Sequence, residues 1–157
     1  MPTRREKRKV PYSADQMFDL IADVERYPEF LPWCSATRTR SRHREGDVEI
    51  MDSEMVVSFK AFRERFGTRV TMRRKEKRIE VAYLDGPFRY LINHWQFHPL
   101  EDGGCEIEFF VDFEFRSAVL QALIGVVFNE AMRRIVRAFE ERAAALYGPG
   151  AQEGQPA

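Results

Sequence analysis

The fold of this chain is decided by two consecutive stretches, CEIEFFVDFEF at residues 105–115 and SAVLQALIGVVFNEAMRRIVRAFEERAAALYG at residues 117–148. Apolar and acidic side chains alternate along the first stretch, which predicts a half-buried antiparallel strand. Ser117 is a favourable N-cap and Gly148-Pro149 terminates a helix, so the second stretch predicts one helix from Ala118 to about Tyr147. Such a helix is about 45 Å long, and the rest of the chain must pack along it.

The two halves of this helix differ in character. Its first half, Ala118–Phe128, includes one polar side chain, Gln121, whereas the second half is amphipathic. Gly125 lies inside the helix, where it costs about 1 kcal/mol relative to alanine. The apolar half either is covered on all sides by the core or lines an apolar cavity, and the sequence leaves both interpretations open.

The residues before the helix predict a run of antiparallel strands. A first strand at residues 4–10 precedes Ser13-Ala14-Asp15-Gln16, a capping box that begins a short helix. The stretch YPEFLPW at residues 27–33 is broken by two prolines and allows only a short helical turn before a strand begins near Cys34. Apolar residues then recur mostly with a period of two up to residue 115.

These elements predict an α+β fold in which the sheet packs around the long helix. A curved antiparallel sheet of about six to seven strands wraps around the long C-terminal helix, with two short helices after the first strand. One hairpin can be predicted in detail: with Glu45-Gly46 as its turn, Arg44 faces Asp47 and Arg42 faces Glu49 across the strands. Pairs of this kind contribute about 0.2–1 kcal/mol each.

Length and composition limit the classes of protein that the chain can belong to. Its 157 residues fit a single domain at residues 1–148 with a polar, disordered tail at residues 149–157. The longest uncharged stretch, residues 117–129, is far shorter than the ~20 residues that span a bilayer. Cys34 and Cys105 make no disulfide framework, so we expect a reducing, cytoplasmic compartment, with a peripheral location at the inner face of the membrane as the alternative.

Catalytic and metal-binding patterns are scarce. The chain has no nucleophile elbow, phosphate-binding loop, dinucleotide fingerprint or zinc-protease motif. His94 and His98 are four residues apart on one predicted strand, about 13 Å from each other, which is too far to share a metal. We therefore predict no catalytic residues, no metal and no cofactor. A cyclase-type enzyme needs an acid or base in its cavity, and only Asp52 and Glu54 interrupt an apolar strand register.

Charge is divided unevenly along the chain. Residues 1–78 carry a net charge of +6 and residues 79–157 a net charge of −6, with basic residues concentrated at Arg38–Arg44 and Arg73–Arg78. This division is typical of a sheet whose two faces differ in charge, and it also suits a basic face for an anionic partner. No base-reading motif is present, and we expect no DNA partner.

Six motifs together resemble a known family. They are YSADQMFDLIADVERYPEFLPWC (12–34), FK (59–60), LDGPF (84–88), HWQF (94–97), FEFRS (113–117) and AFEERAAALYG (138–148). The chain resembles the coenzyme Q-binding START-domain family, part of the polyketide cyclase/dehydrase-like helix-grip superfamily, which also includes the RatA toxins that inhibit ribosomal subunit association. In place of the serine-containing stretch usual in that family, residues 66–70 read FGTRV.

The resemblance implies a tunnel that holds ubiquinone or another polyprenyl lipid. The implied function is that of a non-catalytic quinone chaperone that supports respiration and contacts the membrane surface transiently; the alternative is association with the ribosome as a RatA-like toxin. The side chains expected to line the tunnel are Phe30, Leu31, Trp33, Phe59, Phe66, Phe88, Trp95, Phe97, Phe109, Phe113, Leu120, Ile124 and Phe128. Lys60, Arg69 and His94 are the candidates for the headgroup, unless Lys60 and Arg69 are exposed charges at the sheet edge.

Overall fold

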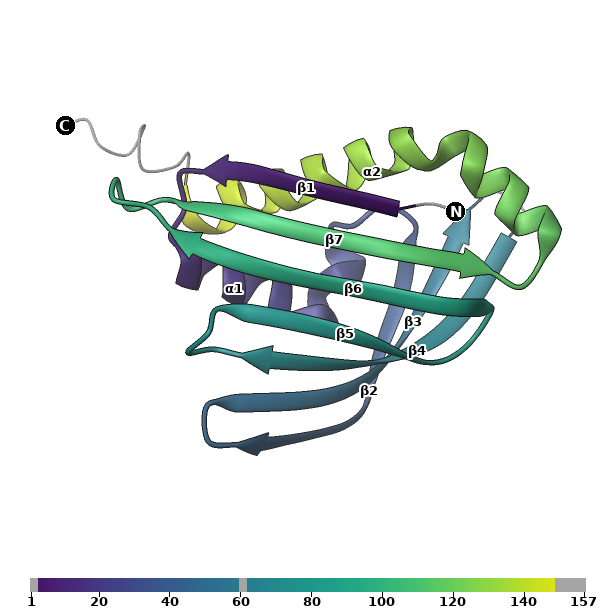
Figure 1. Cartoon of the computed structure of the whole chain (residues 1–157), viewed down its shortest axis with the longest axis horizontal. Helices are drawn as coiled ribbons and strands as arrows, with labels where there is room; N and C mark the ends of the chain where they lie inside the picture. The colour runs from purple at the N-terminus through teal and green to yellow at the C-terminus, as the bar shows by residue number, and fades with distance from the viewer. Residues whose placement is uncertain (1–2, 60–61, 149–157) are drawn as a thin grey trace.

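The predicted helix-grip architecture is confirmed by a computed structural model, which describes residues 3–59 and 62–148 (Figure 1). The elements, in chain order, are β1 (Thr3–Val10), α1 (Ala14–Ala22), the 3₁₀ helix η1 (Val24–Glu29), β2 (Cys34–Glu45), β3 (Val48–Phe59), β4 (Phe62–Arg73), β5 (Arg78–Asp85), β6 (Phe88–Pro99), β7 (Cys105–Phe115) and α2 (Ala118–Tyr147). The strands form one antiparallel sheet in the order β1-β7-β6-β5-β4-β3-β2. The predicted tail at residues 149–157 lies outside the described residues.

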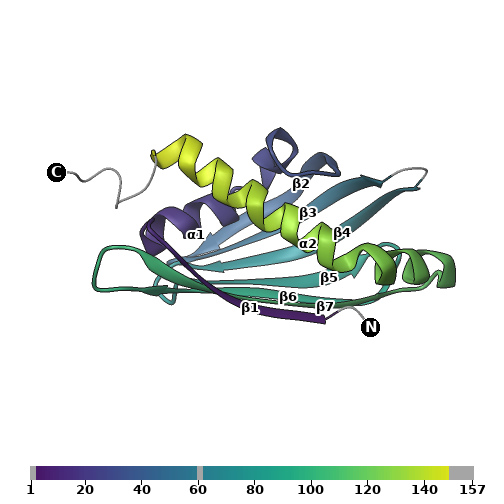
Figure 2. The same ribbon diagram turned by 90° about the horizontal axis from the view of Figure 1, so that it is seen from above.

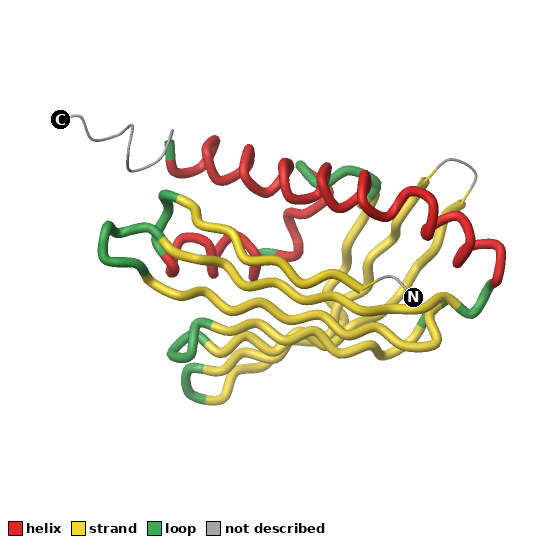
Figure 3. The backbone as a smooth tube through the Cα atoms, turned by 45° about the horizontal axis from the view of Figure 1, so that its top comes forward, coloured by secondary structure: helices red, strands yellow, loops and turns green. Residues whose placement is uncertain are grey.

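The sheet is strongly curved, and α2 crosses its concave side diagonally (Figure 2). α1 lies under the C-terminal half of α2 at one end of the sheet (Figure 1). Near the other end, β3 and β4 extend toward the first half of α2 (Figure 3). This arrangement places the helical elements α1 and η1 at one side of the concave space and leaves the opposite side to α2 alone.

The capping box predicted for α1 is present. The Ser13 hydroxyl accepts a hydrogen bond from the Gln16 backbone N–H at 3.0 Å, and the Gln16 side chain accepts one from the Ser13 N–H at 2.9 Å. Two N–H groups that the helix leaves unsatisfied are thereby bonded. α1 can then bury its apolar side, including Met17 and Phe18, against the sheet.

The predicted β2–β3 hairpin is wrong in one respect: its turn lies one residue later in the chain than expected, which changes the residues that face each other. The loop is Gly46-Asp47, with Glu45 opposite Val48, so Arg44 faces Glu49 and Arg42 faces Met51. Gly46 has a φ of +63°, a left-handed conformation that glycine adopts without steric cost. The turn therefore places glycine at its first central position, not its second.

The tightly packed core occupies the end of the molecule where α1 lies. Its most buried side chains come from α1 and the neighbouring strands: Phe18, Phe97, Met17, Ile21, Met51, Ile79 and Cys105. Along the first half of α2, only Leu120 is buried, whereas Val119 is 67% and Val126 84% exposed. The interpretation in which the core covers this half on all sides is therefore excluded. None of the helices in the described part of the chain is long and apolar enough to cross a membrane.

Both cysteines are buried, and burial raises the pKa of each thiol to about 11. We expect neither Cys34 nor Cys105 to react with iodoacetamide at pH 8 in the folded protein, because the thiolate fraction is on the order of a hundredfold below that of a free thiol. Mass spectrometry of the labelled protein measures this, with the chain unfolded in guanidinium as the control. Labelling of the folded protein at the rate of the unfolded control would contradict the prediction.

The same shift makes stability depend on pH. The folded pKa of each thiol lies above its unfolded value, so the unfolded chain loses its thiol protons first as the pH rises. The contribution of the two thiols to the free energy of unfolding is complete below about pH 9 and is lost as the pH rises toward 11.

Candidate ligand cavity

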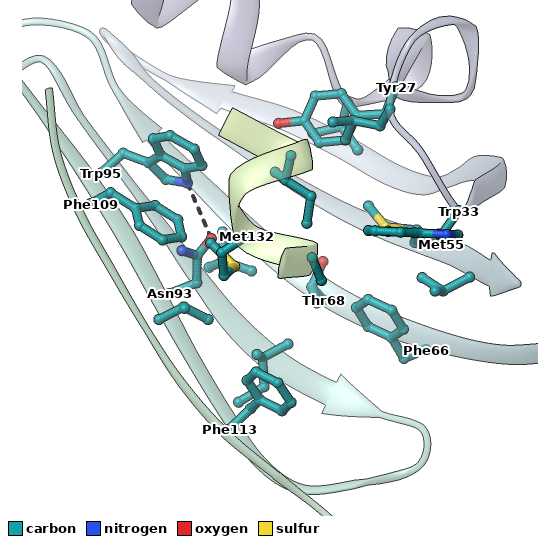
Figure 4. A pocket seen from close by; sticks show the side chains of 18 of the residues that line it. Tyr27, Trp33, Met55, Phe66, Thr68, Asn93, Trp95, Phe109, Phe113 and Met132 are labelled. Carbon is teal, nitrogen blue, oxygen red and sulfur yellow. Dashed lines mark hydrogen bonds between the residues drawn. The ribbon is translucent and has the colours of Figure 1, made fainter. Parts of the chain in front are cut away.

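A cavity of about 360 Å³ lies between the concave face of the sheet and the middle of α2. That volume falls within the ~300–1,000 Å³ typical of ligand pockets. The wall is built by β3–β7, α1, η1 and α2, and it is almost entirely apolar (Figure 4). Aromatic rings from neighbouring strands pack edge to face around it, as Phe88 does with Phe66 and Phe113.

The period of two along the strands determines which side chains reach the cavity. On β6, Leu91, Asn93 and Trp95 point inward, and on β7, alternate residues from Phe109 to Phe115 do so. The intervening residues project from the opposite, convex face. A residue in this sheet therefore lines the cavity or faces solvent according to its position in the alternation.

Few polar groups face the cavity. Trp95 Nε1 donates to Asn93 Oδ1 at 3.1 Å, and Asn93 Nδ2 donates to the Phe110 carbonyl at 2.9 Å, which holds the Asn93 amide in place (Figure 4). The buried Tyr27 hydroxyl donates to the Ile21 carbonyl, and burial raises the pKa of Tyr27. Thr68 is also buried at the wall, and no described side chain or backbone group forms a hydrogen bond with its hydroxyl.

A second cavity, of about 410 Å³, adjoins the first beneath the N-terminal half of α2. The two are adjacent, because they share Trp33, Val57, Phe115, Ile124 and Ala131 as walls, and we call the two cavities together the passage. Charged side chains occur only in the outer cavity, at Glu64, Glu130 and Arg134. We call this outer end, between α2 and the ends of β3 and β4, the mouth.

Trp33 separates the interior from the mouth. It follows the Pro-broken stretch after η1, has a φ of +66° and packs edge to face on Phe59 at a centroid distance of 5.6 Å. Its carbonyl accepts a hydrogen bond from Ser58 N–H at 2.8 Å, which ties the segment to β3. A left-handed conformation is uncommon for a bulky residue and persists only where neighbouring contacts hold it.

Eleven of the thirteen predicted lining residues lie at the passage wall. They are Leu31, Trp33, Phe59, Phe66, Phe88, Trp95, Phe109, Phe113, Leu120, Ile124 and Phe128. Phe30 lies elsewhere: its ring packs on Tyr27 and Phe139 beneath the Arg142 guanidinium. Phe97 points to the concave side but is fully buried in the core against Phe18, where α1 covers the sheet.

The headgroup predictions for Arg69 and His94 are wrong in placement. Both lie on the convex face, because Thr68 and Asn93, their immediate neighbours, point inward. Arg69 pairs with Asp52 at 2.8 Å, and the His94 ring stacks on Phe110 at 5.0 Å. Partial burial and the nearby Arg78 and Arg5 lower the pKa of His94. Lys60 lies outside the described residues.

Besides Tyr27, the polar side chains at the inner cavity are those of Thr68 and Asn93, which the sequence analysis missed. The sequence could have indicated both residues. Thr68 is two residues from Phe66 and Asn93 is two residues before Trp95, so each lies on the same face of its strand as an aromatic residue predicted to line the tunnel. Asp52 and Glu54 lie on the convex face, paired with Arg69 and Arg40. Among the described residues, the inner cavity is lined by no Asp, Glu, His, Lys or Arg.

Such a wall can hold an apolar molecule and donate a few hydrogen bonds to it. A general acid or base must lie within about 2.6–3.2 Å of the proton that it transfers. The Tyr27 hydroxyl, with its raised pKa, is the one titratable group among the described residues of the inner wall. Among the described residues, no cluster of His, Cys, Asp and Glu could hold a metal ion.

Comparison with known proteins agrees with this geometry. A family model described as polyketide cyclase / dehydrase and lipid transport matches residues 10–140. The chain belongs to this family. A solution structure of an 18 kDa protein from Caulobacter crescentus superposes with a TM-score of 0.79 at 37% identity, over 94% of this chain and 99% of that one.

Two named relatives within the polyketide cyclase and lipid transport family carry different functional names. The ribosome association toxin RatA of Escherichia coli is 39% identical over 147 residues, which cover 94% of this chain and 90% of that protein. The mitochondrial coenzyme Q-binding protein COQ10 homolog B of Xenopus laevis is 31% identical over 147 residues, 91% of this chain and 58% of that protein. The predicted resemblance to this RatA-like helix-grip family is confirmed.

The different surroundings of two phenylalanines lead to a stability prediction. Phe97→Ala should lower the free energy of unfolding by about 3–5 kcal/mol, because it leaves a void in a closed core. Phe128→Ala removes a half-buried ring beside space that is already open, and should cost about 1–2 kcal/mol. Urea unfolding followed by circular dichroism measures both, and equal losses would show that Phe97 is not part of the closed core.

Proposed function

We propose that this protein binds a polyprenyl quinone, ubiquinone or a close relative, in the passage between the sheet and α2. The observation that supports the proposal is the apolar passage itself, which runs from Asn93 and the buried Thr68 to a mouth at the end of the molecule. An isoprenoid tail matches such a wall, since each buried CH₂ contributes about 0.8 kcal/mol. The relative named as a coenzyme Q-binding protein supports the choice of ligand.

The headgroup belongs at the inner end in this proposal. A quinone carbonyl accepts hydrogen bonds, and the Thr68 hydroxyl and the second N–H of the Asn93 amide are donors that face the cavity. The tail then extends past Met132 and Ile124 toward Trp33. The quinone is cargo in a non-catalytic chaperone, and the protein needs no resident cofactor for this role.

Loading requires access to the membrane in which such quinones dissolve. Val119 and Val126 are exposed on the first half of α2, the part of the helix that also borders the mouth. We propose that this apolar stripe contacts the cytoplasmic membrane surface transiently, so that the lipid enters the passage without crossing water. The protein is then cytoplasmic between contacts.

The ligand can be identified first. Protein purified from a quinone-producing host should release stoichiometric ubiquinone into an organic extract, as measured by mass spectrometry. Ile124→Glu should lower that content at least about tenfold, because Ile124 lines both cavities and a carboxylate there opposes an apolar tail.

Ala144→Glu is the matched control. It adds the same charge to an exposed position near the far end of α2, and we expect the lipid content to be unchanged. Circular dichroism melting shows whether each variant is folded. A folded Ile124→Glu protein that retains its quinone would contradict the assignment of the passage.

The membrane contact has its own test. Replacing both Val119 and Val126 with Glu should reduce flotation of the protein with anionic vesicles by about tenfold or more, because two carboxylates repel the lipid headgroups. Wild-type protein and Ala144→Glu should float equally well. Equal flotation of all three proteins would exclude this face of α2 as the contact.

A second function is supported by a separate observation. The relative named as a ribosome association toxin shares 39% identity over almost the whole chain. We therefore propose ribosome association as the alternative role. Added to a lysate at low salt, the protein should shift ribosomes toward free subunits in sucrose gradients, and an unchanged profile would exclude this role.

A further inference from the structure

The convex face of β2, β3 and β4 carries an unequal group of charges. Three guanidinium groups surround the single carboxylate of Glu54: Arg40 at 3.0 Å, Arg38 at 3.3 Å and Arg65 at 3.9 Å. The Glu54 side chain is only 15% exposed, whereas those of Arg38 and Arg65 are 74% and 66% exposed. One partly covered anion thus lies beneath two cations that face solvent.

The surrounding pairs fix this group in place. Arg40 also makes two bonds to Asp85, at 2.8 and 2.9 Å, and Arg69 makes two to Asp52, at 2.8 and 2.9 Å. The Arg40 guanidinium lies flat on Gly67, where a Cβ atom would approach within 2.5 Å of it. Bidentate pairs of this kind are well ordered, so the exposed arginines stand on a rigid base.

Charge is in excess at this surface. Arg63, which donates to the Ser58 hydroxyl at 3.5 Å, lies on the same face of β4 as Arg65 and Arg69. The arginine patch therefore comprises Arg38, Arg40, Arg63, Arg65 and Arg69. Against its five positive charges stand three carboxylates, Asp52, Glu54 and Asp85, which leaves a net charge of +2. Pairing with Arg40, with Arg38 and Arg65 close by, lowers the pKa of Glu54.

Several other arginines of the segments Arg38–Arg44 and Arg73–Arg78 are more fully neutralised. Arg42 and Arg44 share Glu49, and Arg42 also approaches Glu25. Arg73 and Arg78 both bond Glu80, and their side chains are about half as exposed as that of Arg38. Arg74 pairs with Asp19. Compared with these arginines, Arg38 and Arg65 are better placed to meet an external anion, because they are more exposed and share one carboxylate with Arg40.

The side chains of the arginine patch indicate which kind of partner it can bind. Its exposed members are guanidinium groups, and the neighbouring Val56 on this face is buried. A membrane surface would be expected to contact several apolar side chains, and the exposed Val119 and Val126 belong to α2, which lies on the other side of the sheet (Figure 2). A rigid array of guanidinium forks instead suits a polyanion with repeated phosphates and no apolar part.

We infer that the arginine patch binds the phosphate backbone of RNA in a ribosomal subunit. This inference rests on the second function proposed above and names the surface that serves it. Arg38 and Arg65 contact the phosphates, while Arg40 and Arg69, already paired, hold the strands beneath them. Recognition through phosphates alone gives no base preference and depends strongly on salt.

The test compares two double variants of the full-length protein. Arg38→Gln/Arg65→Gln removes the two exposed cations of the patch, and Arg26→Gln/Arg133→Gln removes two equally exposed arginines from η1 and α2. Both lose the same charge. Binding to purified bacterial ribosomal subunits is measured by co-sedimentation over a series of salt concentrations, and the lipid content of each variant is measured in parallel.

The patch variant should bind about tenfold more weakly than wild type at low salt. The slope of log affinity against log salt should become shallower by about 2, one for each lost phosphate contact. The control variant should keep the wild-type slope, and both variants should retain the wild-type lipid content. These results together would support the arginine patch as the RNA surface.

Three results would overturn the inference, and they differ from one another. If wild-type protein binds no subunits at any salt concentration, the ribosomal role itself fails. If wild-type and the patch variant bind subunits with the same slope, the role stands and the surface is wrong. If the patch variant loses flotation with anionic vesicles but not binding to subunits, the patch is a membrane site. None of these results affects the quinone proposal, which the lipid content decides.

Discussion

The structure depends on a mismatch in shape: one long helix does not fill the whole concave side of one curved sheet. At one end, α1 and the second half of α2 fill the concave side and close the core around Phe18 and Phe97. Toward the other end, α2 is the one helix of residues 3–59 and 62–148 that lies over the concave face (Figure 2). Side chains as large as phenylalanine and tryptophan line that space without filling it, and an apolar passage results. The closed core and the cavity thus both result from the way the sheet curves around α2, and they lie at different positions along that helix.

The alternation of side chains along each strand also separates cavity-lining residues on one face of the sheet from charged residues on the other. Along β4, Phe66, Thr68 and Val70 face the cavity, while Arg65 and Arg69 face solvent on the other side. A binding site for an apolar molecule and a surface of paired charges can therefore coexist a few ångströms apart without sharing a side chain. The two relatives with different functional names are compatible with one such scaffold, since each role can use its own face.

Much of this could be predicted from the sequence, because strong periodicity leaves little freedom. The alternation of β7, the capping box of α1 and the length of α2 gave the architecture, and aromatic residues in the inward alternation gave most of the wall. The headgroup residues were missed by one position. Arg69 and His94 were chosen because their side chains can bind a headgroup, but it is the neighbouring Thr68 and Asn93 that face the cavity. Phe97 points to the concave side too, but whether α1 or empty space covers it depends on tertiary packing.

Trp33 and Trp95 are the only tryptophans in the chain, and both lie on the wall of the passage: Trp95 lines the inner cavity, and Trp33 lines both cavities. The indole of Trp95 is bonded to Asn93 within the wall, and that of Trp33 stands between the interior and the mouth. Tryptophan emission from this protein therefore originates solely at the passage. The molecule carries its own optical reporter of what the passage contains, without any label.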